Sequence, residues 1–186
     1  MQIWFTSDHH FFHNNIIKYE NRPFGSVEEM NRVMIERWNN VVKPKDLVYY
    51  VGDLIFSSKV LASKIISQLN GDKILIKGNH DKGTDFFLKN GFKSVHDELE
   101  IQIGEHKVLL CHYPYRQSEE EIAKLDYKVK YQDRRPENKG KWLVHGHVHS
   151  AWKIKGNMIC CAVENWNYTP VSIDTILQII EGKFVE

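Results

Sequence analysis

Short polar motifs recur along the chain, and each one comes directly after a run of apolar residues. They are rich in histidine, aspartate and asparagine, whose side chains bind divalent metals. In chain order they are Asp8-His9-His10, Gly52-Asp53, Gly78-Asn79-His80-Asp81, Cys111-His112 and Gly146-His147-Val148-His149. One such motif is common by chance. Five in order, at equivalent places, predict a single metal site assembled from several loops.

The apolar runs that precede the motifs have the length and composition of short buried strands. They occupy residues 2–6, 46–51, 73–77, 106–111 and 142–144. Further strands are predicted at residues 98–103, 152–154, 158–162 and 171–173. Because loops that follow the strands of an α/β sheet meet at one edge, the motifs are expected to converge there. The larger number of strands in the second half predicts a second sheet.

Amphipathic helices are predicted between the early strands. One covers residues 26–41, with Ser26 as N-cap and Glu29 as its capping-box partner, and a second covers residues 60–69. A short helix is expected near residues 85–90 and a last one from 174 to about 181. Alternating strands and helices favour an α/β fold.

Composition limits the classes of protein to consider. A chain of 186 residues is expected to form one domain, 1–186, with an irregular, charge-rich insertion around 113–141. With 25 Lys and Arg against 24 Asp and Glu, the formal charge of +1 gives no global field that would attract nucleic acid or a membrane. No apolar run approaches the roughly 20 residues that span a bilayer, so a cytoplasmic protein is expected. The three cysteines, two of them adjacent, predict buried thiols rather than a disulfide framework.

The series Asp-x-His, Gly-Asp, Gly-Asn-His-Asp, His and Gly-His-x-His resembles the calcineurin-like metallophosphoesterase superfamily. The resemblance covers residues 3–173. It implies a four-layer αββα sandwich, in which two mixed sheets pack face to face and helices flank them. It also implies two divalent metal ions, with Mn²⁺ expected and Fe, Zn²⁺, Co²⁺ or Ni²⁺ compatible with the same ligands.

Carried over position by position, the resemblance implies a role for each motif residue. Asp53 would bridge the two metals, His80 would contact the substrate phosphate and assist the leaving group, and Asp81 would orient the His80 ring. One metal would be held by Asp8, His10 and His149, and the other by Asn79, His112 and His147.

Other polar residues near the motifs carry weaker expectations. Arg22, which precedes a proline, is a candidate clamp for a substrate phosphate, and His13 is a candidate lining residue of the substrate cleft. His9 is expected outside the ligand set, and His145 as a hydrogen-bonded structural histidine. Seven basic residues form either a rim for a polyanion or a solvated loop: Lys124, Lys128, Lys130, Arg134, Arg135, Lys139 and Lys141.

These residues predict a metal-dependent phosphoric ester hydrolase, a phosphodiesterase or phosphatase acting through an activated water. The expected partner is a small phosphorylated substrate, with nucleotides and cyclic nucleotides among the candidates; a membrane is not expected, and nucleic acid is not favoured. Two alternatives stay open. One is a nuclease of the same superfamily, and the other is a non-catalytic, metal-binding interaction scaffold.

Overall fold

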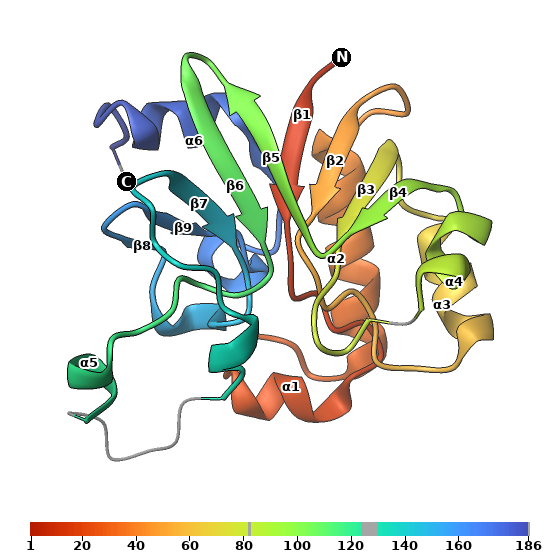
Figure 1. Ribbon diagram of the computed structural model, residues 1–186. Helices are drawn as coiled ribbons and strands as arrows, with labels where there is room; N and C mark the ends of the chain where they lie inside the picture. Colours follow the sequence, from red (N-terminus) through yellow and green to blue (C-terminus); the bar gives the residue numbers. More distant parts are fainter. Residues whose placement is uncertain (82, 124–129, 186) are drawn as a thin grey trace.

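The protein contains two five-stranded sheets, as the computed structural model shows for residues 1–81, 83–123 and 130–185 (Figure 1). In the first sheet, four parallel strands lie in the order β1 (Ile3–Thr6), β2 (Leu47–Tyr50), β3 (Asp72–Ile76) and β4 (Phe92–His96). The short strand β10 (Val171–Ser172) pairs antiparallel with β1. The carboxyl ends of the four parallel strands therefore meet at one edge.

The second sheet has the order β5 (Glu98–Ile103), β6 (His106–Cys111), β7 (Trp142–His145), β9 (Met158–Cys160) and β8 (Ile154–Lys155). Its central strands β6, β7 and β9 are parallel, and the two outer strands are antiparallel to their neighbours. In Figure 1 the carboxyl ends of β6 and β7 lie at the same lower edge as those of β1 and β2. Motifs from both halves of the chain are thus brought to one place.

Apolar side chains from both sheets form the core between them. Phe5 and Ile76 of the first sheet belong to the same buried cluster as Leu110 and Val144 of the second. This cluster also includes one face of α6 (Ile173–Ile180), whose N-cap Ser172 accepts a hydrogen bond from the amide of Thr175. Burial of this cluster fixes the separation of the two sheets and hence of the loops they carry.

Helices cover the outer face of the first sheet. Trp38 of α2 (Val27–Val41) is fully buried in one cluster with Tyr50 and Leu75. In Figure 1, α3 (Lys59–Ile66) and α4 (Thr84–Lys89) lie to the right of the first sheet, α1 (Asn14–Tyr19) lies below the lower ends of the strands, and α5 (Glu119–Ala123) lies at the lower left. The prediction of two mixed sheets packed face to face and flanked by helices is confirmed.

Most predicted elements appear within two or three residues of their expected bounds, and one strand was not predicted. Strand β4 has the sequence Phe92-Lys93-Ser94-Val95-His96, in which Lys93, Ser94 and His96 interrupt any apolar run, although Phe92 and Val95 pack against the core. The capping box at α2 is also shifted. The Ser26 hydroxyl accepts from the amide of Glu29 as predicted, but the Glu29 carboxylate accepts from the amide of Gly25.

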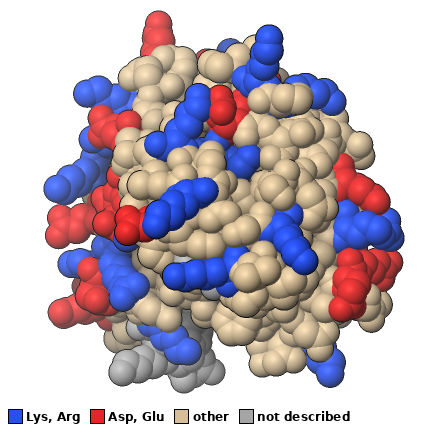
Figure 2. Space-filling view, turned by 90° about the vertical axis from the view of Figure 1, so that its right-hand side faces the viewer, with Lys and Arg blue, Asp and Glu red and all other residues tan. Residues whose placement is uncertain are grey.

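The expectation for the cysteines is confirmed. Cys111, Cys160 and Cys161 are buried and free. On the face that carries α3 and α4, Lys and Arg side chains extend across the middle, and most Asp and Glu side chains lie toward its sides (Figure 2). Among the described residues, no helix combines the length and apolar character needed to cross a membrane.

Candidate metal centre

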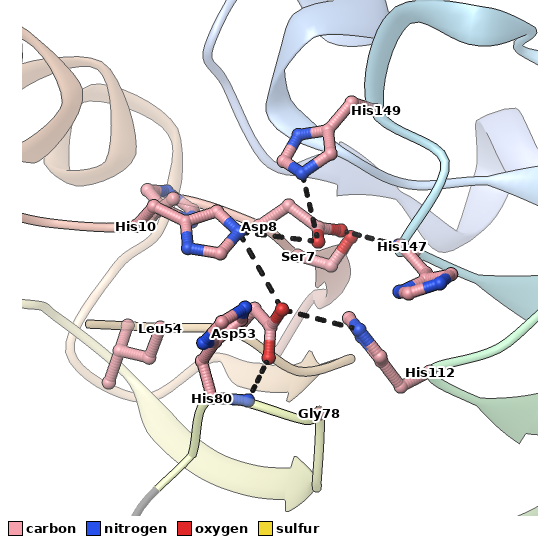
Figure 3. A network of polar contacts seen from close by, with 12 residues as sticks. Ser7, Asp8, His10, Asp53, Leu54, Gly78, His80, His112, His147 and His149 are labelled. Atoms are coloured by element: carbon pink, nitrogen blue, oxygen red, sulfur yellow. Dashed lines mark hydrogen bonds and ion pairs between the residues drawn. The ribbon is translucent and has the colours of Figure 1, made fainter. Parts of the chain in front are cut away.

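The five motifs meet at the carboxyl ends of the strands (Figure 3). Asp8 and His10 follow β1, Asp53 follows β2, Asn79 and His80 follow β3, and His112 directly follows β6. The two remaining histidines, His147 and His149, follow β7. All seven predicted metal ligands therefore come from loops that the two sheets hold next to one another.

Asp8 and Asp53 are the centres of this cluster. The Asp8 Oδ1 atom lies 3.8 Å from both His10 Nε2 and His149 Nε2. The Asp53 Oδ2 atom lies 3.6 Å from His10 Nε2 and 3.5 Å from His112 Nε2. Asp53 thus faces histidines from both sheets, which is the position expected of a bridging carboxylate.

The remaining two predicted ligands lie on the side of His112. The ring centroids of His112 and His147 are 5.2 Å apart. Asn79 lines the same cleft as Asp53 and His147, and its Oδ1 atom is buried. The structure therefore brings together all seven residues that the sequence predicted as ligands.

The donor atoms fit divalent metals. Buried polar atoms are normally hydrogen-bonded, so a group of buried polar atoms without hydrogen-bond partners needs an explanation. Among the described residues, four of the predicted ligands have such atoms at this centre: Asp8 Oδ1, His10 Nδ1 and Nε2, Asn79 Oδ1 and His112 Nε2. In three groups of residues here, the ligand atoms lie close enough together to hold an ion. Two of these groups are Asp8 with His10 and His149, and Asp8 with Asp53 and His112.

The backbone at the centre adopts an uncommon conformation. Asp8, His10, Asp53, His147 and His149 all have left-handed φ values, between 49° and 71°. Such a conformation costs free energy for residues other than glycine and persists where the surrounding structure enforces it. Five ligand positions in this state indicate that the loops are shaped for the site and not for local backbone stability.

Two glycines let the loops approach the carboxylates closely. A Cβ atom at Gly78 would collide with the Asp53 carboxylate, and one at Gly146 would collide with the Asp8 carboxylate and the Ser7 hydroxyl. Glycine is therefore required at these positions to pack backbone against the metal-site carboxylates.

The charges at the centre shift the pKa values of its histidines in opposite directions. Burial alone would lower the pKa of His112, but the neighbouring carboxylates of Asp53 and Asp8 raise it to about 9. Burial lowers the pKa of His147 to about 3, and the charges of His112 and Arg135 act in the same direction. Without a metal, His112 is thus held as a cation by the carboxylates. A metal cation would take over that role, with release of the proton.

His80 lies at the mouth of the centre, where its side chain is exposed. Its amide donates to Asp53 Oδ1 over 2.8 Å, and its ring lies edge-on to His10 and Phe56, with centroids 5.5 and 5.7 Å away. The backbone of His80 therefore supports a predicted ligand, and the contact of its exposed ring with a substrate phosphate stays a prediction.

Asp81 makes contacts different from those expected. Its carboxylate accepts hydrogen bonds from the amides of Asp53, Leu54 and Gly78, over 2.8 to 3.0 Å. Among the described contacts, these amides and not the His80 ring donate to the Asp81 carboxylate. The expected orienting role is corrected accordingly: Asp81 joins the loop after β2 to the loop after β3.

The expectation that Arg22 clamps a substrate phosphate is wrong. The Arg22 side chain is fully buried, and all five of its N–H groups have partners. These partners are the carbonyl oxygens of Asp8 and His9, the Met30 sulfur and the Glu164 carboxylate. Arg22 is therefore a structural cation beneath the metal centre with no donor left for substrate.

Glu164 is a residue of the centre that the sequence did not reveal. It lies in the 3₁₀ helix η3 (Val163–Trp166), and its Oε1 atom contacts Arg22 Nη2 over 2.6 Å and His149 Nδ1 over 3.0 Å. Burial would raise the pKa of Glu164, but His149 and Arg22 outweigh that effect and hold it at about 2. A single glutamate 142 residues from its arginine partner leaves no local signal in the sequence.

The other histidines near the motifs take different positions. His9 is fully buried and its Nδ1 atom lies 2.7 Å from the Tyr50 hydroxyl, so it supports the loop from behind. His145 is buried beside the Gly146 carbonyl and the Trp152 ring, as expected of a structural histidine. His13 lines the cleft at the centre, and its ring centroid lies 5.8 Å from that of His10.

Part of the charged segment 113–141 approaches the centre. Tyr113 and Tyr131 pack their rings on His147, with centroids 5.0 and 5.5 Å away. Arg134 lies over the Tyr131 ring and donates to the Tyr113 hydroxyl, while Lys141 pairs with Glu100. Lys124 and Lys128 lie outside the described residues. In the described part of the segment, Arg134 and Lys141 thus have partners inside the protein.

A sandwich of two mixed sheets with aspartates and histidines gathered at the strand ends defines a class of metal-binding αββα proteins. Within that class, the model of the calcineurin-like phosphoesterase superfamily domain matches residues 1–162. The chain belongs to this superfamily.

Relatives extend over nearly the whole chain. An uncharacterized protein of Methanocaldococcus jannaschii is 38% identical, over 99% of this chain and 94% of its own length. The Gene 66 protein of Mycobacterium phage L5 is 31% identical, over 95% of this chain and 93% of its own. The crystal structure of a protein of unknown function from Aquifex aeolicus superposes with a TM-score of 0.71 at 30% identity, covering 96% of this chain and 98% of that one.

Proposed function

We propose that the protein is a dinuclear metal-dependent phosphoesterase that hydrolyses a phosphomonoester or a small phosphodiester. The observation that supports this most directly is the set of buried polar atoms around Asp53 that have no hydrogen-bond partner among the described residues. In this proposal Asp53 would bridge two divalent ions, with Mn²⁺ the first candidate. Asp8, His10 and His149 would hold one ion, and Asn79, His112 and His147 would hold the other.

Two bound divalent ions would lower the pKa of a water and neutralise charge on the phosphate oxygens. The residues of the chain position these reactants. Asp53 and Asp8 provide the negative charge that retains the ions, and the loop contacts of Asp81 hold Asp53 in place. The His80 ring, exposed at the mouth, contacts the phosphate and gives a proton to the leaving oxygen.

The size of the cleft and the net charge of the chain favour a small substrate. The cleft has a volume of about 380 Å³ and is lined by His10, His13, His80, Lys130 and Tyr131 among others. This volume is at the lower end of the range for small-molecule sites. Proteins that follow a nucleic-acid backbone usually need a basic face, and the near-neutral charge of this chain does not favour one.

The first test is metal content together with substrate range. We expect the metal-stripped protein to take up two equivalents of Mn²⁺ and then to hydrolyse bis(p-nitrophenyl) phosphate, p-nitrophenyl phosphate or a cyclic nucleotide. Metal analysis and release of p-nitrophenolate or nucleotide measure this directly.

The alternatives give different results in the same experiment. Uptake of metal without turnover of any of these compounds would support the interaction scaffold. Faster cleavage of single-stranded DNA than of the small diesters would support a nuclease. A protein that takes up no metal and turns over none of the compounds would contradict the proposal.

A further inference from the structure

Two exposed aromatic rings stand at the mouth of the cleft. Tyr19, at the end of α1, is 71% exposed, and Phe56, which follows the Asp53 loop, is 50% exposed. No other aromatic side chain in the described part of the chain is as exposed as these two. Isolated exposed apolar residues need no explanation, but these two share a neighbour, His13.

His13 connects the two rings. Its ring centroid lies 4.4 Å from that of Phe56 and 6.1 Å from that of Tyr19. The Nδ1 atom of His13 caps α1 by accepting from the amide of Ile16 over 2.9 Å. A ring whose Nδ1 accepts is neutral and carries its hydrogen on Nε2, so His13 offers one donor between two aromatic surfaces.

The backbone of Phe56 and the ring of His13 are anchored before any substrate arrives. The amide of Phe56 donates to the carbonyl of Phe11 over 2.9 Å, which attaches this segment to the loop after β1. The N-cap contact holds His13. Preformed aromatic surfaces bind a flat group at low cost in conformational entropy.

Their position relative to the catalytic groups sets what they can bind. Phe56 lies against His80, and His13 lies against His10, so the rings adjoin the place where the phosphate must bind. We propose that Tyr19, His13 and Phe56 form a subsite for the base of a nucleotide-type phosphoester. This proposal rests on the proposed function, because the metals must hold the phosphate. A lipid chain would match the apolar rings but would leave the His13 donor unused.

The test compares two ligands that differ only in the base. We expect adenosine 5′-monophosphate to bind the Mn²⁺-loaded protein more tightly than ribose 5-phosphate, by roughly 5-fold to 150-fold, the range for stacking of one base on aromatic side chains. Phe56→Ala and Tyr19→Ala should reduce this ratio and leave the affinity for ribose 5-phosphate unchanged. Leu88→Ala, which removes an exposed apolar side chain of α4 outside the cleft, is the matched control. Isothermal titration calorimetry with the phosphonate analogues of both ligands, in which a CH₂ group replaces the ester oxygen, gives each affinity without turnover.

Equal affinity for the two ligands in the wild-type protein would overturn the subsite, as would a ratio that both alanine variants retain. The proposed function is tested separately by hydrolysis of bis(p-nitrophenyl) phosphate. Turnover of that diester without a base preference removes the subsite alone. A base preference without any turnover removes the phosphoesterase and keeps the subsite.

A separate observation concerns the contacts behind His149. Glu164 Oε1 accepts from His149 Nδ1 and from Arg22, and Arg22 in turn donates to the carbonyl oxygens of Asp8 and His9. A carboxylate at Nδ1 keeps the ring hydrogen on that atom. The Nε2 atom, which lies 3.8 Å from Asp8 Oδ1, would then present its lone pair to an ion that the two residues hold together. We infer that Glu164 is a positioning residue for the metal that His149 holds.

Replacement of Glu164 by glutamine keeps its size and removes its charge. We expect Glu164→Gln to weaken Mn²⁺ binding by roughly 10-fold to 100-fold, the range for partners of metal-bound histidines. The matched control is Glu20→Gln, because Glu20 also lies near His149 but bonds to the Ser150 hydroxyl. Competition with a chromophoric chelator measures both affinities.

An equal loss in the two variants would contradict positioning, since it would show only the effect of one negative charge. Unchanged affinity in a folded Glu164→Gln protein would contradict it as well. If that variant does not fold, the wild-type protein decides: nitrogen NMR of the Zn²⁺-loaded form should show the His149 hydrogen on Nδ1, and a hydrogen on Nε2 would overturn the inference.

Discussion

Replacing His80 by alanine is expected to lower turnover by roughly 100-fold to 10,000-fold, the usual contribution of a positioned general acid or base. The two metals should stay bound, because His80 supports the site through its backbone. Its amide donates to Asp53 Oδ1, and alanine retains that amide. Steady-state kinetics and metal analysis of the same preparation separate the two effects.

The leaving group reveals what His80 does. If the ring gives a proton to the leaving oxygen, His80→Ala should lose more activity on a phenyl or alkyl ester than on a p-nitrophenyl ester, whose leaving group needs little protonation. An equal loss on both would indicate contact with the phosphate alone. His96→Ala is the control, since His96 bonds to Ser94 on strand β4. If His80→Ala kept activity near that of the wild type, the role assigned to His80 would be wrong.

The sequence predicted where the ligands come together because a simple rule governs it. Each motif follows an apolar run, and parallel strands bring their carboxyl ends to one edge. Asp8 and Asp53 come from neighbouring strands of one sheet, and His112 and His147 from neighbouring strands of the other. The apolar patterns that build the two sheets were visible in the sequence, so the convergence of the motifs could be inferred.

The groups behind the ligands could not be predicted in the same way. Arg22 and Glu164 form a buried ion pair between two segments that show no pattern in common. An arginine beside a proline is compatible with phosphate binding and with burial, and only the position of Glu164 decides between them. Likewise, the Asp81 carboxylate bonds to backbone amides, which exist at every position except proline and give no sequence signal.

The backbone conformation of the ligand residues also could not be predicted from the sequence. Left-handed φ values are expected at glycine, whereas here they occur at aspartate and histidine. At Asp53, with φ 58°, the conformation is fixed by hydrogen bonds on both sides: its amide donates to Asp81, and its carbonyl accepts from His10. Tertiary contacts impose this geometry, so local preference does not foretell it.

Replacing Asp53 by asparagine is expected to have the largest effect on metal binding. Asparagine has the same shape and keeps an oxygen for the His80 amide, but it removes the negative charge between His10 and His112. Because Asp53 is proposed to contact both ions, the loss of affinity should exceed the roughly 10-fold to 100-fold that is typical of residues that contact a ligand and not the metal itself. Metal titration of Asp53→Asn beside the Glu164→Gln protein makes this comparison.

The metal-stripped protein gives an independent readout of the same substitution. The pKa of His112 is raised to about 9 by Asp53 and Asp8, against an unfolded value near 6.5. The interaction of His112 with these carboxylates therefore contributes to the free energy of unfolding. The contribution is fully present below pH 6.5 and is lost as the pH rises through about 9. In Asp53→Asn the pKa of His112 should fall, and this part of the pH dependence of unfolding should shrink.

These two readouts distinguish a metal ligand from a residue needed only for folding. A ligand role requires weak metal binding by a variant that still folds, with the His112 titration moved toward lower pH. If Asp53→Asn bound two equivalents of Mn²⁺ with wild-type affinity, Asp53 would not bridge the ions, and the proposed dinuclear centre would need a different common ligand. Asp8 is the remaining candidate, because it belongs both to the group with His10 and His149 and to the group with Asp53 and His112.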